Sequence, residues 1–317
     1  TNMRQSIESF GGKFLFATKL TDINIKNGKI ESVVLNNQEV VPCFGLVLAL
    51  GHSARDTFYM LNEKGLAMEN KPFAVGLRIM HPQNLIDENQ YGFLDSKLPA
   101  ASYKLTFKAS NGKGVYSFCM CPGGYVVNAS SETNRLCING MSYAQRDSGI
   151  ANSALIVTVN ETDYGTTLFA GVEFQRKLEA KAYQLGKGLI PMETYGDYKD
   201  NKNPKSLDKL EPKIKGQYHL ANLNELLPLN LNIALKEGIE NFDKKIKGFA
   251  SNEALLCGIE SRSSSPLRIT RNEYYESNIS GIYPCGEGAG YAGGITSAAI
   301  DGLKVSEAIM NKFKPLR

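Results

Sequence analysis

The stretch from Gly281 to Asp301 constrains the fold of this chain more than any other part of the sequence. It reads Gly-Ile-Tyr-Pro-Cys-Gly-Glu-Gly-Ala-Gly-Tyr-Ala-Gly-Gly-Ile-Thr-Ser-Ala-Ala-Ile-Asp. The apolar run 282–284 predicts a short buried strand, and the apolar periodicity from Ile295 to Met310 predicts one helix. A strand, a glycine-rich turn and a helix bring backbone N–H groups and a helix N-terminus close to an anion such as a phosphate.

Five glycines fill the turn between this strand and this helix: Gly286, Gly288, Gly290, Gly293 and Gly294. Glycine is needed where a Cβ would block close approach of a ligand, or where φ is positive. Glu287 stands just after the strand, where a carboxylate can accept hydrogen bonds from sugar hydroxyls. The alternative is a crossover that only packs a helix closely on a sheet. The density of glycines, with a carboxylate among them, favours a cofactor site.

This stretch resembles the C-terminal flavin-binding signature of two-dinucleotide-fold flavoproteins. It is similar to that of a bacterial family of uncharacterized FAD-dependent dehydrogenases, also described as NAD(FAD)-utilizing dehydrogenases. The resemblance covers nearly the whole chain and includes five further motifs in the same order. These motifs are Leu48-Ala-Leu-Gly-His-Ser-Ala-Arg-Asp56, Phe118-Cys-Met-Cys-Pro-Gly-Gly124, Asn139-Gly-Met-Ser-Tyr143, Ala151-Asn-Ser-Ala154 and Gly258-Ile-Glu-Ser-Arg-Ser-Ser-Ser-Pro266.

The resemblance implies an α/β fold in which a partial Rossmann-like FAD domain carries an inserted, mainly antiparallel β substrate domain. Members of the family begin with a strand and a Gly-x-Gly-x-x-Gly turn that hold the FAD pyrophosphate. This sequence has no such turn near its beginning, where the glycines are Gly11, Gly12 and Gly28. We therefore expect the C-terminal part of such a protein. The expected domains are an FAD-domain remnant over 1–55 and 270–317, and a substrate domain over 56–269.

Local patterns in the first 62 residues predict a meander, a strand and a helix. Two hairpin turn signals, Asn27-Gly28 and Asn36-Asn37, predict a β-meander. Its strands are expected over 18–25, 30–35 and 39–41. The apolar run 44–50 predicts a strand that is covered on both faces, and 53–62 predicts a helix with Ser53 as its N-cap.

From residue 73 onward the pattern changes to short apolar runs separated by glycines, with few helices between them. This pattern predicts an antiparallel sheet, because βαβ units would place a helix after each strand. The periodicity of 168–185 predicts a helix that ends at Gly186. Residues 195–216 are rich in Lys, Asp, Asn and Pro and are expected to form a mobile surface loop.

The resemblance also implies which residues bind the cofactor. The turn and the start of the last helix would hold the flavin and its ribityl end, and two earlier positions would lie close to the rest of the dinucleotide. At Leu20 backbone atoms would contact adenine, and Gly51 would pass near the dinucleotide. The residues expected at the flavin end are Gly286, Glu287, Gly293, Gly294 and Ile295.

Three residues are candidates for the substrate face: His52, Arg262 and Arg268. Two arginines in one polar segment suit an anionic substrate or the pyrimidine edge of a flavin, whose reduced form is anionic. The alternative for Arg262 is an internal ion pair with Glu260. His52 follows a buried strand, where active-site residues of open α/β sheets lie, and the alternative is a structural histidine.

Cys119 and Cys121 stand two apart in a predicted strand and would share one face of it. A redox pair is conceivable, but Cα atoms at this spacing are roughly 6.5–7 Å apart, near the upper limit for a disulfide. No second pair of Cys or His has zinc spacing. We therefore expect buried cysteines that line a cavity facing the flavin, six reduced thiols in all, and no metal site.

Composition restricts the expected cellular location and the classes of binding partner. Among 317 residues, 42% are hydrophobic and 21% are charged, which is ordinary for a globular protein, and the formal net charge is only +4. No apolar run approaches the ~20 residues of a membrane span, and the first residues have no signal-peptide pattern. We expect a cytoplasmic location and a small-molecule substrate, for which an anion would suit the arginines. Neither a membrane nor a nucleic acid is expected as a partner, because no basic stripe is present.

The resulting functional hypothesis is the C-terminal portion of an FAD-dependent oxidoreductase, a dehydrogenase whose substrate the sequence does not identify. In this hypothesis FAD belongs to the longer protein, and the 317-residue chain alone holds it weakly or not at all. One alternative is an FAD-dependent tRNA-modifying enzyme, because such enzymes share a similar glycine-rich end. The other alternative is a non-catalytic binding scaffold with a flavoprotein fold.

Overall fold

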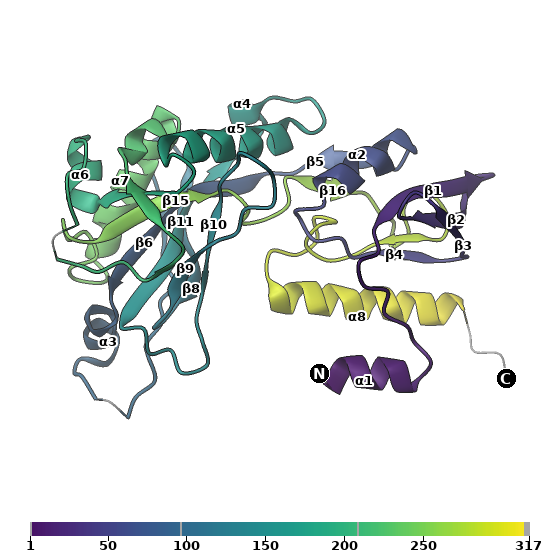
Figure 1. Ribbon diagram of the computed structural model, residues 1–317, viewed down its shortest axis with the longest axis horizontal. Helices are drawn as coiled ribbons and strands as arrows, with labels where there is room; N and C mark the ends of the chain where they lie inside the picture. The colour runs from purple at the N-terminus through teal and green to yellow at the C-terminus, as the bar shows by residue number, and fades with distance from the viewer. Residues whose placement is uncertain (1, 96, 208, 314–317) are drawn as a thin grey trace. The chain divides into compact units, whose positions relative to one another are not determined.

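A computed structural model describes residues 2–95, 97–207 and 209–313, and the chain divides into two compact units (Figure 1). Unit 1 combines the residues up to Glu69 with those from Arg268 onward, and unit 2 comprises Asn70–Leu267. Helix α2 (Arg55–Glu63), expected in the substrate domain, lies in unit 1, where Lys64 directly after it pairs with Asp22 of the meander. The assignment of the units as flavin-domain remnant and substrate domain stays a prediction.

Unit 2 is built on a seven-stranded sheet that is antiparallel except for one edge pair. The long central strands β6 (Phe73–Pro82) and β11 (Ile150–Val159) pair along their whole length and are buried at nearly every residue. In spatial order the strands are β14 (Tyr218–Leu220), β12 (Ile190–Thr194), β15 (Leu255–Glu260), β6, β11, β8 (Gly114–Cys121) and β7 (Thr106–Lys108). Only β12 and β14 run parallel. The expected mixed α/β fold with a mainly antiparallel sheet is therefore confirmed.

Both faces of this sheet are covered. Helix α7 (Leu229–Asp243) packs on one face, where a Cβ at Gly238 would stand only 2.6 Å from Val115, so this glycine permits the close approach. On the other face lies β10 (Ile138–Met141), where Gly140 meets the side chain of Arg78. Strand β10 belongs to a small second sheet with β9 (Tyr125–Asn128) and β13 (Ile214–Lys215). The core of unit 2 therefore has three layers.

The remaining helices of unit 2 flank the sheet. Helix α5 (Ala170–Leu185) contacts β12 and β15 and ends at Gly186 as predicted, and a Cβ at Gly186 would lie 1.9 Å from the carbonyl oxygen of Leu189. The short helices are α3 (Gln83–Tyr91), α4 (Glu161–Tyr164), α6 (Tyr195–Asp200) and the 3₁₀ turn η1 (Leu223–Glu225).

The predicted surface loop over 195–216 is wrong at its beginning, where the chain forms α6. Tyr195 and Tyr198 are fully buried there, and their hydroxyls donate to Glu240 and Asn232 at 2.7 and 2.8 Å. The average composition of the segment is polar, but two tyrosines three residues apart share one helix face and bury it. A loop expected from composition therefore begins with an element of the core.

Unit 1 contains the predicted meander, β1 (Leu20–Lys26), β2 (Lys29–Leu35) and β3 (Glu39–Pro42). The turn between β1 and β2 has positive φ at both Asn27 and Gly28, as its sequence predicts. The next strand, β4 (Leu46–Leu48), is shorter than expected and pairs in parallel with β17 (Ile282–Pro284). The beginning and the end of the chain thus meet in one small parallel pair.

The described residues of unit 1 also form three helices, α1 (Asn2–Ser9), α2 and α8 (Ile295–Lys312). Ser53 is not the N-cap of α2, because the helix begins one residue later than expected and Ala54 takes that position without a side-chain hydrogen bond. Residues 13–16, between α1 and β1, are irregular chain. At the boundary between the units, β5 (Met68–Asn70) pairs with β16 (Leu267–Ile269). None of the described helices is both long and apolar enough to cross a lipid bilayer.

Candidate cofactor site

The glycine-rich turn starts where β17 ends and is closed by its own backbone. The N–H of Cys285 still donates to the carbonyl of Leu48, at 3.0 Å, so the ladder with β4 extends one residue beyond the strand. Gly286 then takes a φ of +75°, which an L-residue rarely adopts. The N–H of Tyr291 donates back to the carbonyl of Gly286 at 3.1 Å, and the N–H of Gly290 donates to the carbonyl of Glu287 at 2.9 Å. These bonds define a compact turn, 286–291.

Open space lies in front of the helix that follows the turn. Gly294 is the N-cap of α8, and no described side chain caps this helix end. A Cβ at Gly293 would meet no described atom within 4 Å, and one at Gly294 would meet only Ser297 Oγ at 3.9 Å. Ile295, the first residue of the helix, is 93% exposed. Because the first N–H groups of a helix have no intrahelical partners, this end offers donors to a ligand.

Gly51 lies against the turn, as a contact with Gly288 shows. A Cβ at Gly288 would stand 2.3 Å from the carbonyl oxygen of Gly51, and Gly51 itself has a φ of +67°. The two backbones therefore approach as only glycine allows. Gly288, Gly290 and Gly293 also have the Gly-x-Gly-x-x-Gly spacing, after a strand and before a helix, that cradles a dinucleotide phosphate. The residues present thus fit a dinucleotide cofactor.

The other predicted cofactor and catalytic positions of unit 1 are Leu20, His52 and Arg268. Leu20 opens β1 and faces Leu35 in the meander. His52 directly follows Gly51, is 8% exposed, and its Nδ1 lies 3.4 Å from the hydroxyl of Ser53. Arg268 is partly exposed, donates to Glu69 at 3.3 Å, and lies with its Cζ 5.4 Å from the ring centre of Tyr291.

Arg262 belongs to unit 2 and is held in an ion pair. Its Nε and Nη2 donate to the two carboxylate oxygens of the fully buried Glu179 at 2.9 and 3.0 Å, and its Nη1 donates to Ser131 at 2.6 Å. Burial, the largest single effect, lowers the pKa of Arg262, but the hydrogen bond with Glu179 and the nearby negative charges together hold the pKa above the usual value. The pairing of Glu260 with Arg262, considered from the sequence, is wrong, because Glu260 pairs with Arg78.

An ion pair between Arg271 and Asp301, which the sequence analysis missed, holds the start of the turn in place. Arg271 donates to Asp301 through two nitrogens, at 3.0 and 2.6 Å, and to the carbonyl of Pro284 at 2.8 Å. The Oδ2 of Asp301 also accepts the N–H of Gly286 at 2.8 Å. Burial alone would raise the pKa of Asp301, but the hydrogen bonds from Arg271 and Gly286 hold it below the usual range. Asp301 and Val305 are the buried positions of α8. A carboxylate at a buried helix position indicates a partner elsewhere in the chain, and this was the available sequence signal.

Cys119 and Cys121 differ in solvent exposure, contrary to the expectation that both are buried. A β-bulge interrupts the pairing of β8 with β11 between Phe118 and Cys121. Cys119 lies in this bulge with a φ of +44° and is exposed, whereas Cys121 is buried. Burial raises the pKa of the Cys121 thiol. All six cysteines are free thiols in the structure. The bulge breaks the strand alternation on which the shared face was predicted.

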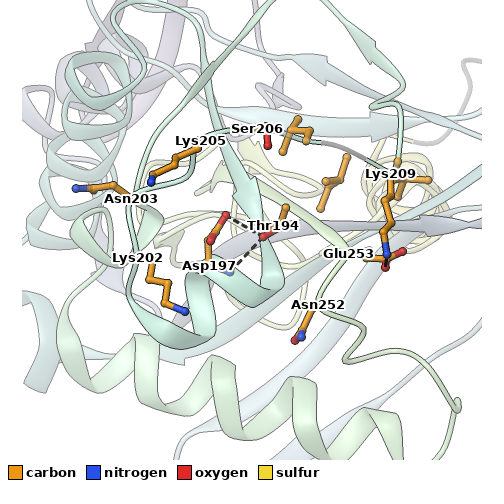
Figure 2. A pocket seen from close by; sticks show the side chains of 12 residues that line it. Thr194, Asp197, Lys202, Asn203, Lys205, Ser206, Lys209, Asn252 and Glu253 are labelled. Carbon is orange, nitrogen blue, oxygen red and sulfur yellow. Dashed lines mark hydrogen bonds and ion pairs between the residues drawn. The ribbon is translucent and has the colours of Figure 1, made fainter.

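A pocket of about 700 Å³ opens elsewhere, on the surface of unit 2 (Figure 2). Thr194 and Asp197 form part of its wall and are joined by hydrogen bonds of 3.0 and 3.1 Å, and Lys209 pairs with Glu253 at its rim. None of the predicted site residues lines it. Its lysines are Lys202, Lys205 and Lys209.

Comparison with known proteins identifies one family. The family model "FAD-dependent protein, C-terminal domain-like" matches residues 72–263, more than half of the chain. A protein of Clostridium beijerinckii, described as uncharacterized, is 50% identical over an alignment of 319 residues that covers 98% of this chain and 60% of that protein. The chain thus spans well under two thirds of this relative.

Two solved structures are more distant. An oxidoreductase from Methanosarcina mazei has a TM-score of 0.38 at 13% identity, over 96% of this chain and 52% of that one. The L-proline dehydrogenase from P. horikoshii has a TM-score of 0.35 at 14% identity, over 95% of this chain and 50% of that one. Likenesses this weak say nothing about activity.

Proposed function

Because the chain belongs to the family of FAD-dependent proteins that share this C-terminal domain, we propose that it is the C-terminal portion of an FAD-dependent oxidoreductase, a dehydrogenase. The observation that supports the proposal is the uncapped start of α8, with open space at Gly293 and Gly294 and with Gly51 against the turn. When bound, FAD supplies the redox chemistry, and the protein supplies binding, orientation and electrostatics.

The residues of this chain would divide that work as follows. The first N–H groups of α8 would donate to the polar edge of the cofactor, with Ile295 against its apolar part. The Glu287 carboxylate would accept hydrogen bonds from ribityl hydroxyls. His52 and Arg268 would face the substrate, for which a small anion fits best. In unit 2, Arg262 stays a separate candidate for binding an anionic substrate, and it would keep its pair with Glu179.

We further propose a reducing, cytoplasmic setting, because all six cysteines are free thiols and reducing compartments maintain them in that state. The electron partner and the substrate are to be found by screening small organic acids and amines as donors to the bound flavin. The proposal does not include a nucleic-acid partner.

The test uses the longest natural polypeptide that contains this sequence, purified and examined for bound flavin by its visible absorption spectrum. A Gly293→Val variant should lose FAD, because the new side chain would begin in the open space that the proposal assigns to the ligand, where its Cβ meets no described atom within 4 Å. Gly45→Val is the matched control, since a Cβ at Gly45 also meets no described atom within 4 Å. A colourless protein that binds no added FAD would overturn the proposal and favour the non-catalytic scaffold.

A further inference from the structure

The turn 286–291 is fixed to the rest of unit 1 by three side chains, those of Arg271, Asp301 and Tyr291. Arg271 is bonded to Asp301 and to the carbonyl of Pro284, as described, and both side chains of the pair are less than 10% exposed. The guanidinium carbon of Arg271 lies 3.5 Å from the ring centre of Tyr291, the last residue of the turn. The Tyr291 hydroxyl donates to the carbonyl of Ile269 at 3.1 Å. Both ends of the turn are thus held by one buried pair.

The hydrogen bond between Asp301 and Gly286 connects the Arg271–Asp301 pair to Glu287, the residue proposed to bind the cofactor. Gly286 immediately precedes Glu287, and its N–H has Asp301 as acceptor. Gly286 adopts a positive φ and has no side chain that would restrict its backbone. The hydrogen bond from its N–H to Asp301 therefore helps to select one backbone orientation. Asp301 lies on α8, whose N-terminus forms the other side of the site. A shift of Asp301 would therefore move Glu287 relative to the helix N-terminus.

We propose that Arg271 and Asp301 are positioning residues for the flavin, acting through the Gly286 amide to fix Glu287 against the start of α8. The inference rests on the proposed function above. Neither residue is assigned a contact with the cofactor. Arg271 orients the carboxylate by a two-point bond, and the carboxylate orients the turn.

The proposal predicts coupling between Asp301 and Glu287. In the longest natural polypeptide that contains this sequence, Asp301→Asn should weaken FAD binding about ten- to a hundredfold, the value of one or two charge-assisted hydrogen bonds. If Asp301 acts through Glu287, the same change should have a much smaller effect in a Glu287→Gln background. Isothermal titration with FAD measures all four affinities of this cycle. Arg271→Lys retains the charge without the two-point geometry and should be intermediate.

A matched control separates positioning from general destabilisation. Glu276 also accepts a glycine N–H, that of Gly281, and pairs with Lys312, but lies outside the turn 286–291. Glu276→Gln should lower the thermal midpoint of the apoprotein without changing the absorption spectrum of the bound flavin, whereas Asp301→Asn should shift that spectrum. Equal FAD affinity in Asp301→Asn and wild type, or additive effects in the cycle, would overturn the positioning role alone. A wild-type protein that binds no FAD would overturn the proposed function as well.

Discussion

Arg78 and Glu260 form a two-point ion pair in the middle of the seven-stranded sheet, with Nε–Oε2 and Nη2–Oε1 distances of 3.0 and 3.1 Å. Arg78 is completely buried, and its other N–H groups donate to Asn152, Asn139 and the carbonyl of Cys119. One guanidinium thus connects β6 to four other strands, β15, β11, β10 and β8. Burial, the largest single effect, lowers the pKa of Arg78, but the charge and the hydrogen bonds of Glu260, together with smaller contributions, hold the pKa above its usual value.

The first prediction follows from this pair. Glu260→Ala leaves a buried cation without its counter-charge, and we expect unit 2 to lose about 3–5 kcal/mol of stability. Hydrogen exchange of peptides from β6 and β15 measures the loss of stability within unit 2, so unfolding of unit 1 does not contribute to the result. Glu211→Ala, which breaks an exposed pair with Lys213, should leave that exchange unchanged. Equal exchange in the Glu260 variant and wild type would show that the pair contributes nothing.

The second prediction concerns Glu193, a fully buried carboxyl on β12. Burial raises its pKa to about 8, although its Oε1 accepts the N–H of Leu223 at 2.6 Å. Its Oε2 accepts no hydrogen bond from a described residue. The folded protein therefore prefers the protonated acid. Its contribution to stability is complete below the unfolded pKa, near 4.5, and is lost as the pH rises toward 8.

Glu193→Gln keeps the acceptor for Leu223 and removes the ionisation, so the variant should gain stability relative to wild type as the pH rises. The gain should be small at pH 5 and approach about 1.4 kcal/mol per pH unit between the two pKa values. Urea unfolding at a series of pH values measures it. A constant difference between variant and wild type from pH 5 to pH 8 would contradict the assignment.

His81 provides the third prediction, in which stability is lost as the pH falls and not, as for Glu193, as it rises. It is buried, its Nε2 lies 2.8 Å from the carbonyl of Phe249 and so must carry the proton, and burial lowers its pKa to about 4. Stability from His81 is present above the unfolded pKa of about 6.5 and is lost as the pH falls toward 4. His81→Gln should flatten the acid limb of the stability profile in this window. The same urea series, carried down to pH 4, tests it; an unchanged slope would refute it.

The fourth prediction is that the 317-residue chain by itself holds FAD weakly or not at all. The turn 286–291 and the start of α8 can hold one end of the cofactor, and the proposal assigns the other end to a part of the protein outside this sequence. Three missing charge-assisted hydrogen bonds, each ~1.5–3 kcal/mol, would weaken binding by about three to six orders of magnitude. Equilibrium dialysis with FAD measures this. Submicromolar, stoichiometric binding would show that these residues suffice.

The sequence predicts those elements whose signals are local. Asn27-Gly28 requires positive φ and predicts the hairpin, and Gly186 marks the end of α5. The short apolar runs separated by glycines from residue 73 onward predict the antiparallel sheet, because no helical pattern lies between most of them. The glycine run predicts the turn before α8.

The parts that sequence reasoning misses depend on partners distant in the chain. Asp301 and its partner Arg271 stand 30 residues apart, and Glu260 has Arg78, not its neighbour Arg262, as partner. The bulge at Cys119 has no local signal, because the pairing with β11 creates it. Ile295 was counted with the apolar face of α8, yet tertiary packing leaves it exposed.

The surface of α8 has a practical consequence for anyone who prepares this protein. Only Asp301 and Val305 are fully buried on an 18-residue helix, while Leu303 and Met310 are more than 60% exposed. Apolar side chains in water favour self-association and stain with hydrophobic dyes. Replacing Leu303 and Met310 by glutamate should give a better-behaved sample for crystallisation or NMR. Ile295 should be kept, because it is exposed at the start of α8 and the proposed function places it against the apolar part of the flavin.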